Sequence, residues 1–277
     1  MTATLCARNL KIVTLVAALC SANIVWGEDV AAPAKPAEVT QDPAALAKAK
    51  EEEAAKKVAW HGDVAFAFGL TDGTKSTLQL GGSASANKEW GKNILKLGVD
   101  GQYGLDNFGE TNEQANAASL HGGIGYQRLL TSHWYADARL DAFYNGIQEV
   151  HYRIIVGPAI GYYFIKNDKT KLNAEAGMSY VAERVGSRND DQYWAIRLGE
   201  RFEHSFFKGT KFWEGVNYYP KISDFMDYLL EAEVGTEAAI NSRMSLRVVF
   251  VDRYNSNPPP GITPNDMSLL CSIVYRY

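Results

Sequence analysis

Residues 266–277, DMSLLCSIVYRY, alternate between two kinds of side chain up to the last residue of the chain. Successive side chains of a β-strand point to opposite faces. One face of this stretch is therefore apolar, and the other is mixed and carries Arg276, Ser272 and Ser268. The apolar face consists of Met267, Leu269, Cys271, Ile273, Tyr275 and Tyr277. A strand in the wall of a β-barrel and a strand of a soluble secreted β-sandwich would both alternate in this way, so the rest of the chain has to distinguish them.

From Trp60 onward the chain repeats this alternation in segments of about ten to fifteen residues, separated by clusters of Gly, Asn, Asp, Ser and Lys. The clearest segments, 134–144 and 171–182, carry charges on one face only. This pattern predicts about twelve strands. Their approximate ranges are 60–70, 74–86, 93–104, 118–129, 134–144, 150–164, 171–182, 192–206, 211–222, 224–239, 243–255 and 266–277.

The links between these segments alternate in length. Every second link is short, namely 87–92, 130–133, 166–170, 207–210 and 241–242, and the longest links, 105–116, 183–191 and 256–265, fall between them. Outer-membrane barrels have short periplasmic turns and longer extracellular loops, whereas a sandwich has no reason to sort its links by length. The sequence therefore predicts an all-β fold, a transmembrane up-and-down antiparallel β-barrel of about 12 strands in the outer membrane of a Gram-negative-type cell.

Aromatic residues gather near the ends of the predicted strands, which is typical of the aromatic girdles of membrane barrels. Trp60, Trp90, Trp134, Phe164, Phe206, Phe212, Tyr275 and Tyr277 are expected at the periplasmic rim, and Tyr103, Tyr144, Tyr193, Trp194 and Tyr254 at the outer rim. Two residues do not fit the pattern. Glu200 would face lipid, and Pro158 interrupts a strand, so a β-bulge is expected near each of them.

The first 57 residues predict two segments that precede the barrel. Residues 1–27 have the features of a signal peptide, because Arg8 and Lys11 are followed by an apolar run, 12–19, that is shorter than the roughly 20 residues of a membrane-spanning helix. Residues 28–57 are rich in Ala, Lys, Glu and Pro and predict a periplasmic linker. Asp42 and Pro43 can begin a short helix there, either solvated or filling the lumen. The barrel domain is predicted to cover residues 58–277.

The composition excludes several classes of protein. Cys6 and Cys20 belong to the predicted signal peptide, so Cys271 alone remains and an intramolecular disulfide is not expected. A net charge of -4 provides no basic surface for nucleic acid. The chain has no metal-binding, phosphate-loop or nucleophile motif, so no cofactor and no catalytic residue are expected. His204 and Ser205 are adjacent in a strand and would point to opposite faces, which disfavours a lipid-acting barrel enzyme without removing it as an alternative.

Charged residues of both signs fall on the face of the strands that is predicted to point into the barrel, because charges at bilayer depth must face the interior or a partner. They either pair across the lumen and fill it, or they line a narrow, wet channel, as the width of a twelve-stranded barrel favours. The predicted lumen-lining residues are Asp137, Arg139, Asp141, Arg153, Glu175, Arg197, Arg201, Asp227, Glu231, Glu233, Arg247 and Arg253.

Two resemblances agree with this interpretation. The stretch 60–82, with Trp60, Gly62, the turn 71–74 and the glycines Gly81 and Gly82, resembles the opening hairpin of the salt-induced outer-membrane proteins, a barrel family defined by a domain of unknown function. The resemblance covers about residues 58–277 and implies location and architecture, since that family has no established activity to carry over. The last strand resembles the closing strand of outer-membrane barrels, which implies outer-membrane lipid and, through Tyr277, the barrel-assembly machinery as partners.

Overall fold

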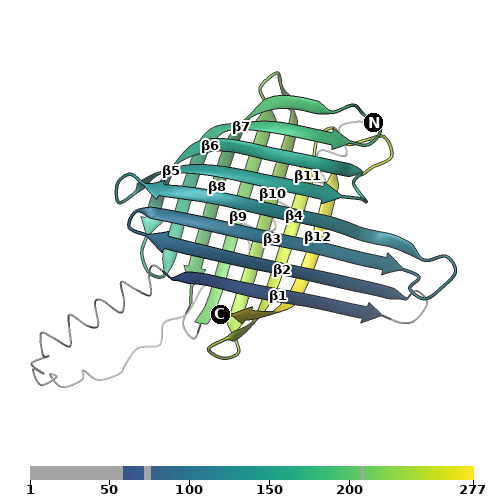
Figure 1. Cartoon of the computed structure of the whole chain (residues 1–277), viewed down its shortest axis with the longest axis horizontal. Coiled ribbons are helices and arrows are strands. Elements are labelled where there is room, and N and C mark those ends of the chain that lie inside the picture. Colours follow the sequence, from purple (N-terminus) through teal and green to yellow (C-terminus); the bar gives the residue numbers. More distant parts are fainter. Residues whose placement is uncertain (1–58, 72–75, 207–208) are drawn as a thin grey trace, which may run out of the picture. The chain divides into compact units, whose positions relative to one another are not determined.

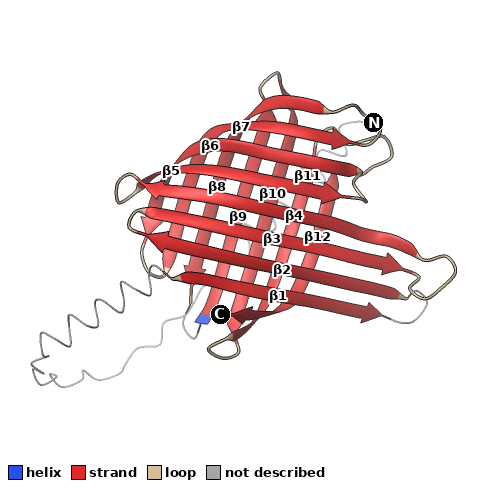
Figure 2. Cartoon of the chain, viewed as in Figure 1, coloured by secondary structure: helices blue, strands red, loops and turns tan. Residues whose placement is uncertain are grey.

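Period-two patterning produces strands throughout the part of the chain that the computed structural model describes, residues 59–71, 76–206 and 209–277. The predicted signal peptide, 1–27, and the predicted linker with its helix, 28–57, lie outside these residues. Twelve strands make up nearly all of the described chain (Figure 2). They are β1 (Trp60–Thr71), β2 (Thr77–Trp90), β3 (Asn93–Asp106), β4 (Gln114–Leu129), β5 (Trp134–Asn145), β6 (Val150–Lys166), β7 (Thr170–Val185), β8 (Asp191–Ser205), β9 (Thr210–Lys221), β10 (Asp224–Ala239), β11 (Met244–Asn255) and β12 (Asn265–Arg276).

The twelve strands close into one barrel. Each strand pairs antiparallel with its neighbours in the sequence, and β1 pairs with β12 through Asp63 opposite Arg276 to Phe66 opposite Ile273. In Figure 1 the strands in front, β2 to β6, cross over β10 to β12 behind them, as tilted strands on opposite walls of a barrel do. The predicted barrel and its strand number are confirmed, and the β-sandwich alternative is wrong, because no sheet edge is left among the described strands.

The links again form two groups at the two ends of the barrel. We call one end the turn rim; it carries the fully described links 91–92, 130–133, 167–169 and 240–243, together with Trp60 and Tyr277. The other end, the loop rim, carries the fully described links 107–113, 146–149, 186–190, 222–223 and 256–264. No helix in the described residues is long and apolar enough to cross a membrane.

The outward face of the barrel is apolar from strand to strand. Phe66, Phe68 and Leu269 are exposed by two thirds or more although they lie in the middle of paired strands. An apolar surface of this extent on a monomer indicates contact with lipid or with another protein. The last strand has the predicted faces, with Ile273 and Tyr275 exposed outside and Val274 fully buried inside.

The outward aromatic residues lie at both rims, with one correction to the prediction. Trp60 and Trp134 are exposed at the turn rim, and Tyr144 and Trp194 are exposed at the loop rim. Tyr193 was expected beside Trp194 on the outside. It faces the lumen instead and donates its hydroxyl to Glu183 Oε1 at 3.0 Å, because neighbouring residues of a strand cannot share a face.

Neither Glu200 nor Pro158 is accommodated by a β-bulge, so that expectation is wrong. The register of β8 with β9 is the same on both sides of Glu200, which faces outward opposite Val216. The register of β6 with β7 is likewise unchanged across Pro158. Gly177 on β7 makes this possible, because a Cβ there would collide with the backbone of Pro158 and Ala159. A close approach of the two strands therefore replaces the bulge.

Candidate functional site

The lumen of the barrel holds the charged residues that the sequence places on the inward face. The strand registers put one set of alternate residues inside, and this set contains every predicted lumen-lining residue. They are Asp137, Arg139 and Asp141 on β5, Arg153 on β6, Glu175 on β7, Arg197 and Arg201 on β8, Asp227, Glu231 and Glu233 on β10, and Arg247 and Arg253 on β11. The structure divides them among several separate networks.

The most deeply buried network lies on the wall made by β5 to β8. The guanidinium of Arg197, with 1% of its side chain exposed, donates to Asp137 Oδ2 and lies 3.2 Å from Glu175 Oε1. Arg139 Nη2 lies 3.4 Å from the same Glu175 oxygen. Tyr135 donates its hydroxyl to Glu175 Oε2 at 3.3 Å. Five polar side chains from three strands are thus held together in the interior.

Small residues between the charged ones allow these contacts to cross the wall. Arg197 on β8 faces Gly177 on β7, Gly177 faces Ala159 on β6, and Ala159 faces Asp137 on β5. The long arginine side chain can therefore extend over two strands to reach the carboxylate. Gly161 has the same role for Tyr135, whose ring occupies the space where a Cβ of Gly161 would be.

An apolar cluster lies on the same wall, closer to the loop rim. Ile155, Val181, Ala195, Tyr219 and Leu229 are buried against one another, and Phe143 and Tyr193 pack against them. These side chains come from β5 through β10 and form an apolar core on that wall below the loops.

The opposite wall, β1 to β4, leaves space in the lumen. Its inward positions include Ala67, Ser83, Ser85, Gly98 and Gly125, all of them small. Gly98 and the neighbouring inward residue Lys96 are exposed to solvent although they lie in the middle of β3. A Cβ at Gly98 would meet no atom within 4 Å, so free space lies beside this wall.

Lys96 differs from the other inward cations of the central lumen. Arg139, Arg197 and Arg201 each lie within 3.5 Å of a carboxylate oxygen. For Lys96 no ion pair within 4.0 Å is found among the described residues, although Arg139 and Arg201 are close enough to act on its charge. The open part of the lumen thus contains an ammonium group with no directly paired carboxylate.

A histidine lies between two carboxylates at the edge of the open space. His121 Nδ1 is 2.8 Å from Asp100 Oδ1, and its Nε2 is 3.3 Å from Asp141 Oδ1. The ring stacks on Phe143 with the centroids 4.3 Å apart. Both ring nitrogens can donate at once only in the protonated imidazolium, so this geometry suits a charged histidine. The network connects the packed wall to the open one.

The pairing between β10 and β11 differs from the expected one, in which Glu233 lies near the level of Arg247 and Asp227 near Arg253. In the structure Glu237 faces Arg247 and Glu231 faces Arg253, with the Arg253 Nε donating to Glu231 Oε1 at 3.0 Å. The expectation is a counting error, because Glu233 lies eight residues before residue 241 whereas Arg247 lies five residues after residue 242. The turn occupies residues 240–243 and is closed by the Asn241 N–H donating to the Met244 carbonyl at 3.1 Å.

The remaining two acids of this strand have other partners. Glu233 accepts a hydrogen bond from Trp213 Nε1, and its Oε1 lies 3.9 Å from Arg201 Nη1. Asp227 lies at the loop rim, where its Oδ2 is 3.9 Å from Lys221 Nζ. The acidic residues of β10 and the basic residues of β11 therefore do not face each other as two simple rows.

A second buried network lies close to the turn rim and spans the seam where the barrel closes. Glu237 accepts hydrogen bonds from Arg247 Nε and Ser245 Oγ, both at 2.7 Å, and from Arg276. Arg247 Nη2 lies 3.0 Å from Asp63 Oδ2. These five residues come from β10, β11, β12 and β1, so the network connects the first strand to the last three.

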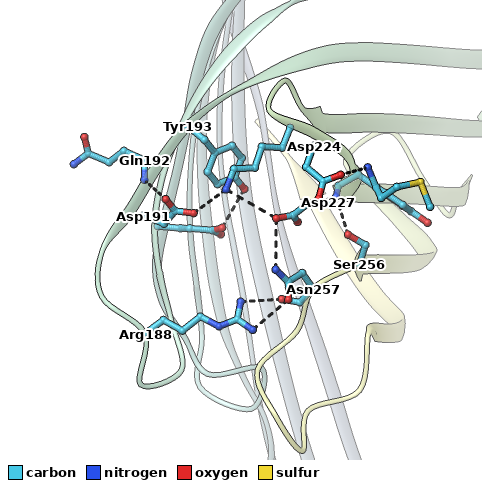
Figure 3. A network of polar contacts seen from close by, with 12 residues as sticks. Arg188, Asp191, Gln192, Tyr193, Asp224, Asp227, Ser256 and Asn257 are labelled. Carbon is cyan, nitrogen blue, oxygen red and sulfur yellow. Dashed lines mark hydrogen bonds and ion pairs between the residues drawn. The ribbon is translucent and has the colours of Figure 1, made fainter.

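Polar contacts also join the loops at the loop rim (Figure 3). Arg188, in the link after β7, donates to the Asn257 carbonyl and the Asn257 Oδ1, each at 3.2 Å, and to the Pro258 carbonyl at 3.1 Å. Lys221 Nζ lies 3.0 Å from Asp191 Oδ2. The loops after β7 and β11 are thus linked to each other.

The described residues contain no group of three or more His, Cys, Asp or Glu side chains that could hold a metal ion. His204 faces outward, where its Nδ1 lies 2.8 Å from Thr170 Oγ1, and Ser205 faces inward opposite Lys211. The two residues point to opposite faces, as predicted. Cys271 is exposed on the outward face of β12.

Sequence reasoning missed the two residues at the centre of the seam network. Glu237 and Arg276 have the same inward parity as their neighbours Glu233 and Ser272, so strand alternation alone could have included them. Asp63 was missed for a different reason. Its importance depends on the closure of β1 onto β12, which brings it near Arg247, and no local pattern shows that contact.

Comparison with known proteins gives one family and a group of barrels. A family model described as "Protein of unknown function, DUF481" matches residues 64–277. No curated protein matches the chain. Among solved structures, the translocator domain of the autotransporter NalP from Neisseria meningitidis is 10% identical with a TM-score of 0.44, and the match covers 84% of this chain and 96% of that one. An outer membrane channel of the COG4313 type from Pseudomonas putida F1 is 11% identical with a TM-score of 0.44, covering 79% and 95% of the two chains. The NanC porin is 8% identical with a TM-score of 0.44, covering 79% and 97%.

Proposed function

The chain belongs to the DUF481 family of proteins of unknown function, and we propose that it is an outer-membrane barrel whose lumen forms a narrow, water-filled pore for small polar solutes. The outward face supports the location, because a closed barrel with an apolar exterior leaves no backbone group unpaired in lipid. The loop rim then faces the outside of the cell and the turn rim faces the periplasm, as in other outer-membrane barrels. The predicted signal peptide, 1–27, and linker, 28–57, agree with this orientation.

The asymmetry of the lumen carries the proposal for a pore. The wall of β5 to β8 carries the Arg197 network and much of the apolar cluster, whereas the inward positions of β1 to β4 include the small residues Ala67, Ser83, Ser85, Gly98 and Gly125. A lumen that was only structural would be packed on both sides. The exposure of Lys96 and Gly98 in the middle of β3 supports a path along this wall. A narrow path of this kind admits small hydrated solutes and ions.

Replacing Lys96 with glutamate is expected to shift the ion selectivity of the pore toward cations severalfold. Lys96 is the lumenal cation without a close carboxylate, so reversing its charge changes the electrostatic potential where the path is open. Reversal potentials of the purified full chain in planar bilayers, under a salt gradient, measure the effect. The shift should shrink at high ionic strength, because salt screens the charge.

The matched control is Lys88→Glu, which makes the same charge change on the outward face of the adjacent strand, where Lys88 lies over the Trp60 ring. Its reversal potential should equal that of the unaltered protein. An unaltered protein that assembles and conducts no ions would disprove the pore. Conduction with a reversal potential that does not respond to Lys96→Glu would remove β3 from the path.

We also propose that the outward face of β12, ending in Tyr277, is the surface through which the barrel-assembly machinery recognises the chain. The Tyr277 ring lies outside the barrel over Gly62, so a side chain at position 62 would collide with the ring. The backbone N–H of Tyr277 donates to the Gly62 carbonyl at 3.2 Å. An aromatic side chain at this position adds apolar surface to the seam at the turn rim.

Replacing Tyr277 with aspartate is expected to reduce the amount of assembled barrel severalfold, because a carboxylate at this position would be desolvated against lipid. The amount of heat-modifiable protein in outer-membrane fractions measures assembly. Tyr277→Phe, which keeps the ring, is the control and should assemble normally. If Tyr277→Asp assembles as well as Tyr277→Phe, the terminal ring is not part of the recognised surface.

A further inference from the structure

A cavity lies inside the barrel next to the loop rim. It has a volume of about 480 Å³ and is bounded by β1 to β4, the end of β5, β11 and β12. Cavities of roughly 300–1,000 Å³ are typical of small-molecule sites. The cavity opens on the proposed path, so a solute that enters from the loop rim meets it first.

The polar side chains of this cavity are mainly amides and hydroxyls. They are Gln79, Gln102, Asn116, Asn145, Ser119 and Ser268. An amide both donates and accepts hydrogen bonds, and so does a serine hydroxyl. The hydroxyl groups of a polyol have the same dual character, so they can exchange hydrogen bonds with any of these side chains without regard to protonation.

The amides come from opposite sides of the cavity and are already oriented. Gln102 on β3 donates to Ser268 Oγ on β12 at 3.4 Å, across the small inward residue Gly81 on β2. Gln79 donates to Asn116 Oδ1 at 2.9 Å. Asn145 on β5 donates to Asp266 on β12 at 2.6 Å and accepts from two backbone N–H groups. Polar groups that are held in place lose little conformational freedom when a ligand binds.

The two charges of the cavity are engaged with other protein groups. Arg253 donates through Nε to Glu231, and its guanidinium lies 5.8 Å from the centre of the Phe143 ring. Asp266 accepts from Asn145. One positive and one negative side chain give the cavity no net charge, which gives neither an anion nor a cation an advantage.

We propose that this cavity is a binding site for uncharged polyhydroxylated solutes of the size of a mono- or disaccharide. The physiological role of this site rests on the proposed pore, because the bound solutes would be the class that the outer end of the path selects. The site itself needs only the folded barrel. Binding and conduction are therefore separate measurements.

The test is isothermal titration calorimetry of the refolded full chain with glucose and with sucrose, in an amine-oxide detergent because maltoside headgroups would compete. We expect saturable binding of at least one of the two sugars. The double variant Gln102→Leu with Ser268→Leu removes an amide and a hydroxyl and narrows the cavity, and it should weaken binding at least tenfold. Heat-modifiable gel migration establishes that each variant is folded.

The control is Asn87→Leu, which removes an amide from the inward face of β2 outside the cavity and should bind the sugars as the unaltered chain does. Absence of saturable binding to the unaltered chain, or equal binding by the double variant, would overturn the proposal. Tighter binding of gluconate than of glucose would also overturn it and would assign the cavity to anions on Arg253. Sugar binding without ion conduction would uphold this site and disprove the pore.

Discussion

Replacing Arg197 with methionine is expected to destabilise the folded barrel by about 3–5 kcal/mol, because removing one partner of a buried ion pair leaves the other charge uncompensated. Arg197 lies between Asp137 and Glu175, whose side chains are also nearly buried. Without the guanidinium, two carboxylates remain close together in a region from which the apolar cluster excludes water. Urea unfolding of the purified protein in detergent, followed by heat-modifiable gel migration, measures the change in the free energy of unfolding.

A double variant distinguishes loss of a charge partner from loss of packing. Arg197→Met with Asp137→Leu removes both charges and keeps apolar volume, and Glu175 still has Arg139 and Tyr135 as partners. Such a replacement of a buried pair is often neutral, so most of the lost stability should return. The surface control is Arg184→Met, which breaks an exposed contact of 3.9 Å with Asp190 and should change stability by less than about 1 kcal/mol. If the single and the double variant are equally unstable, the network acts through packing and not through charge.

Replacing Glu237 with alanine is the second change with a large expected effect, a loss of about 3–5 kcal/mol for the same physical reason. Glu237 is the common acceptor for Arg247, Arg276 and the fully buried Ser245. Its removal leaves Asp63 as the remaining carboxylate beside Arg247. Because these residues connect β10 to β12 with β1, the variant should open the barrel at its seam before the other strand pairs separate.

Two measurements test this prediction. Urea unfolding gives the loss of stability, and hydrogen exchange of the amides of β1 and β12 shows whether the seam opens first. Glu231→Ala is the matched control, since it removes the same side chain from the same strand, where the pair with Arg253 has about a quarter of each side chain exposed. We expect this control to lose less than about 1 kcal/mol. Uniform exchange over all strands in Glu237→Ala would contradict a special role of the network in closure.

The sequence predicted which face of a strand each residue occupies better than it predicted which residue lies opposite on the next strand. Alternation depends on local geometry, so it assigned Ala138 and Leu140 to the outside and Asp137 and Arg139 to the inside of β5 without any knowledge of the other strands. Among the rim aromatics, Tyr193 lies on the unexpected face. Tyr193 and Trp194 are adjacent in one strand, so alternation places them on opposite faces.

Register was harder to predict, because it is fixed by the turns and by the closure of the barrel. The turn at residues 240–243 places Glu237 opposite Arg247, and a miscount of the residues on either side of the turn assigns the wrong partner. Contacts across two strands need still more information. The contact of Arg197 with Asp137 requires Gly177 and Ala159 to lie between them, and these four residues come from four strands. No single segment of the sequence contains that pattern.

The division of the lumen into a packed wall and an open wall has a consequence for the evolution of the protein. Much of the stability depends on β5 to β8, where buried charges and glycines constrain one another, whereas the proposed path depends on small side chains of β1 to β4. Substitutions at Ser83 or Gly98 can alter the width and polarity of the path without touching a buried ion pair, whereas Ser85 donates a hydrogen bond to Asp63 of the seam network. Selection for a new permeant and selection for folding would then act on different residues, so homologous chains could diversify in specificity while keeping the same barrel.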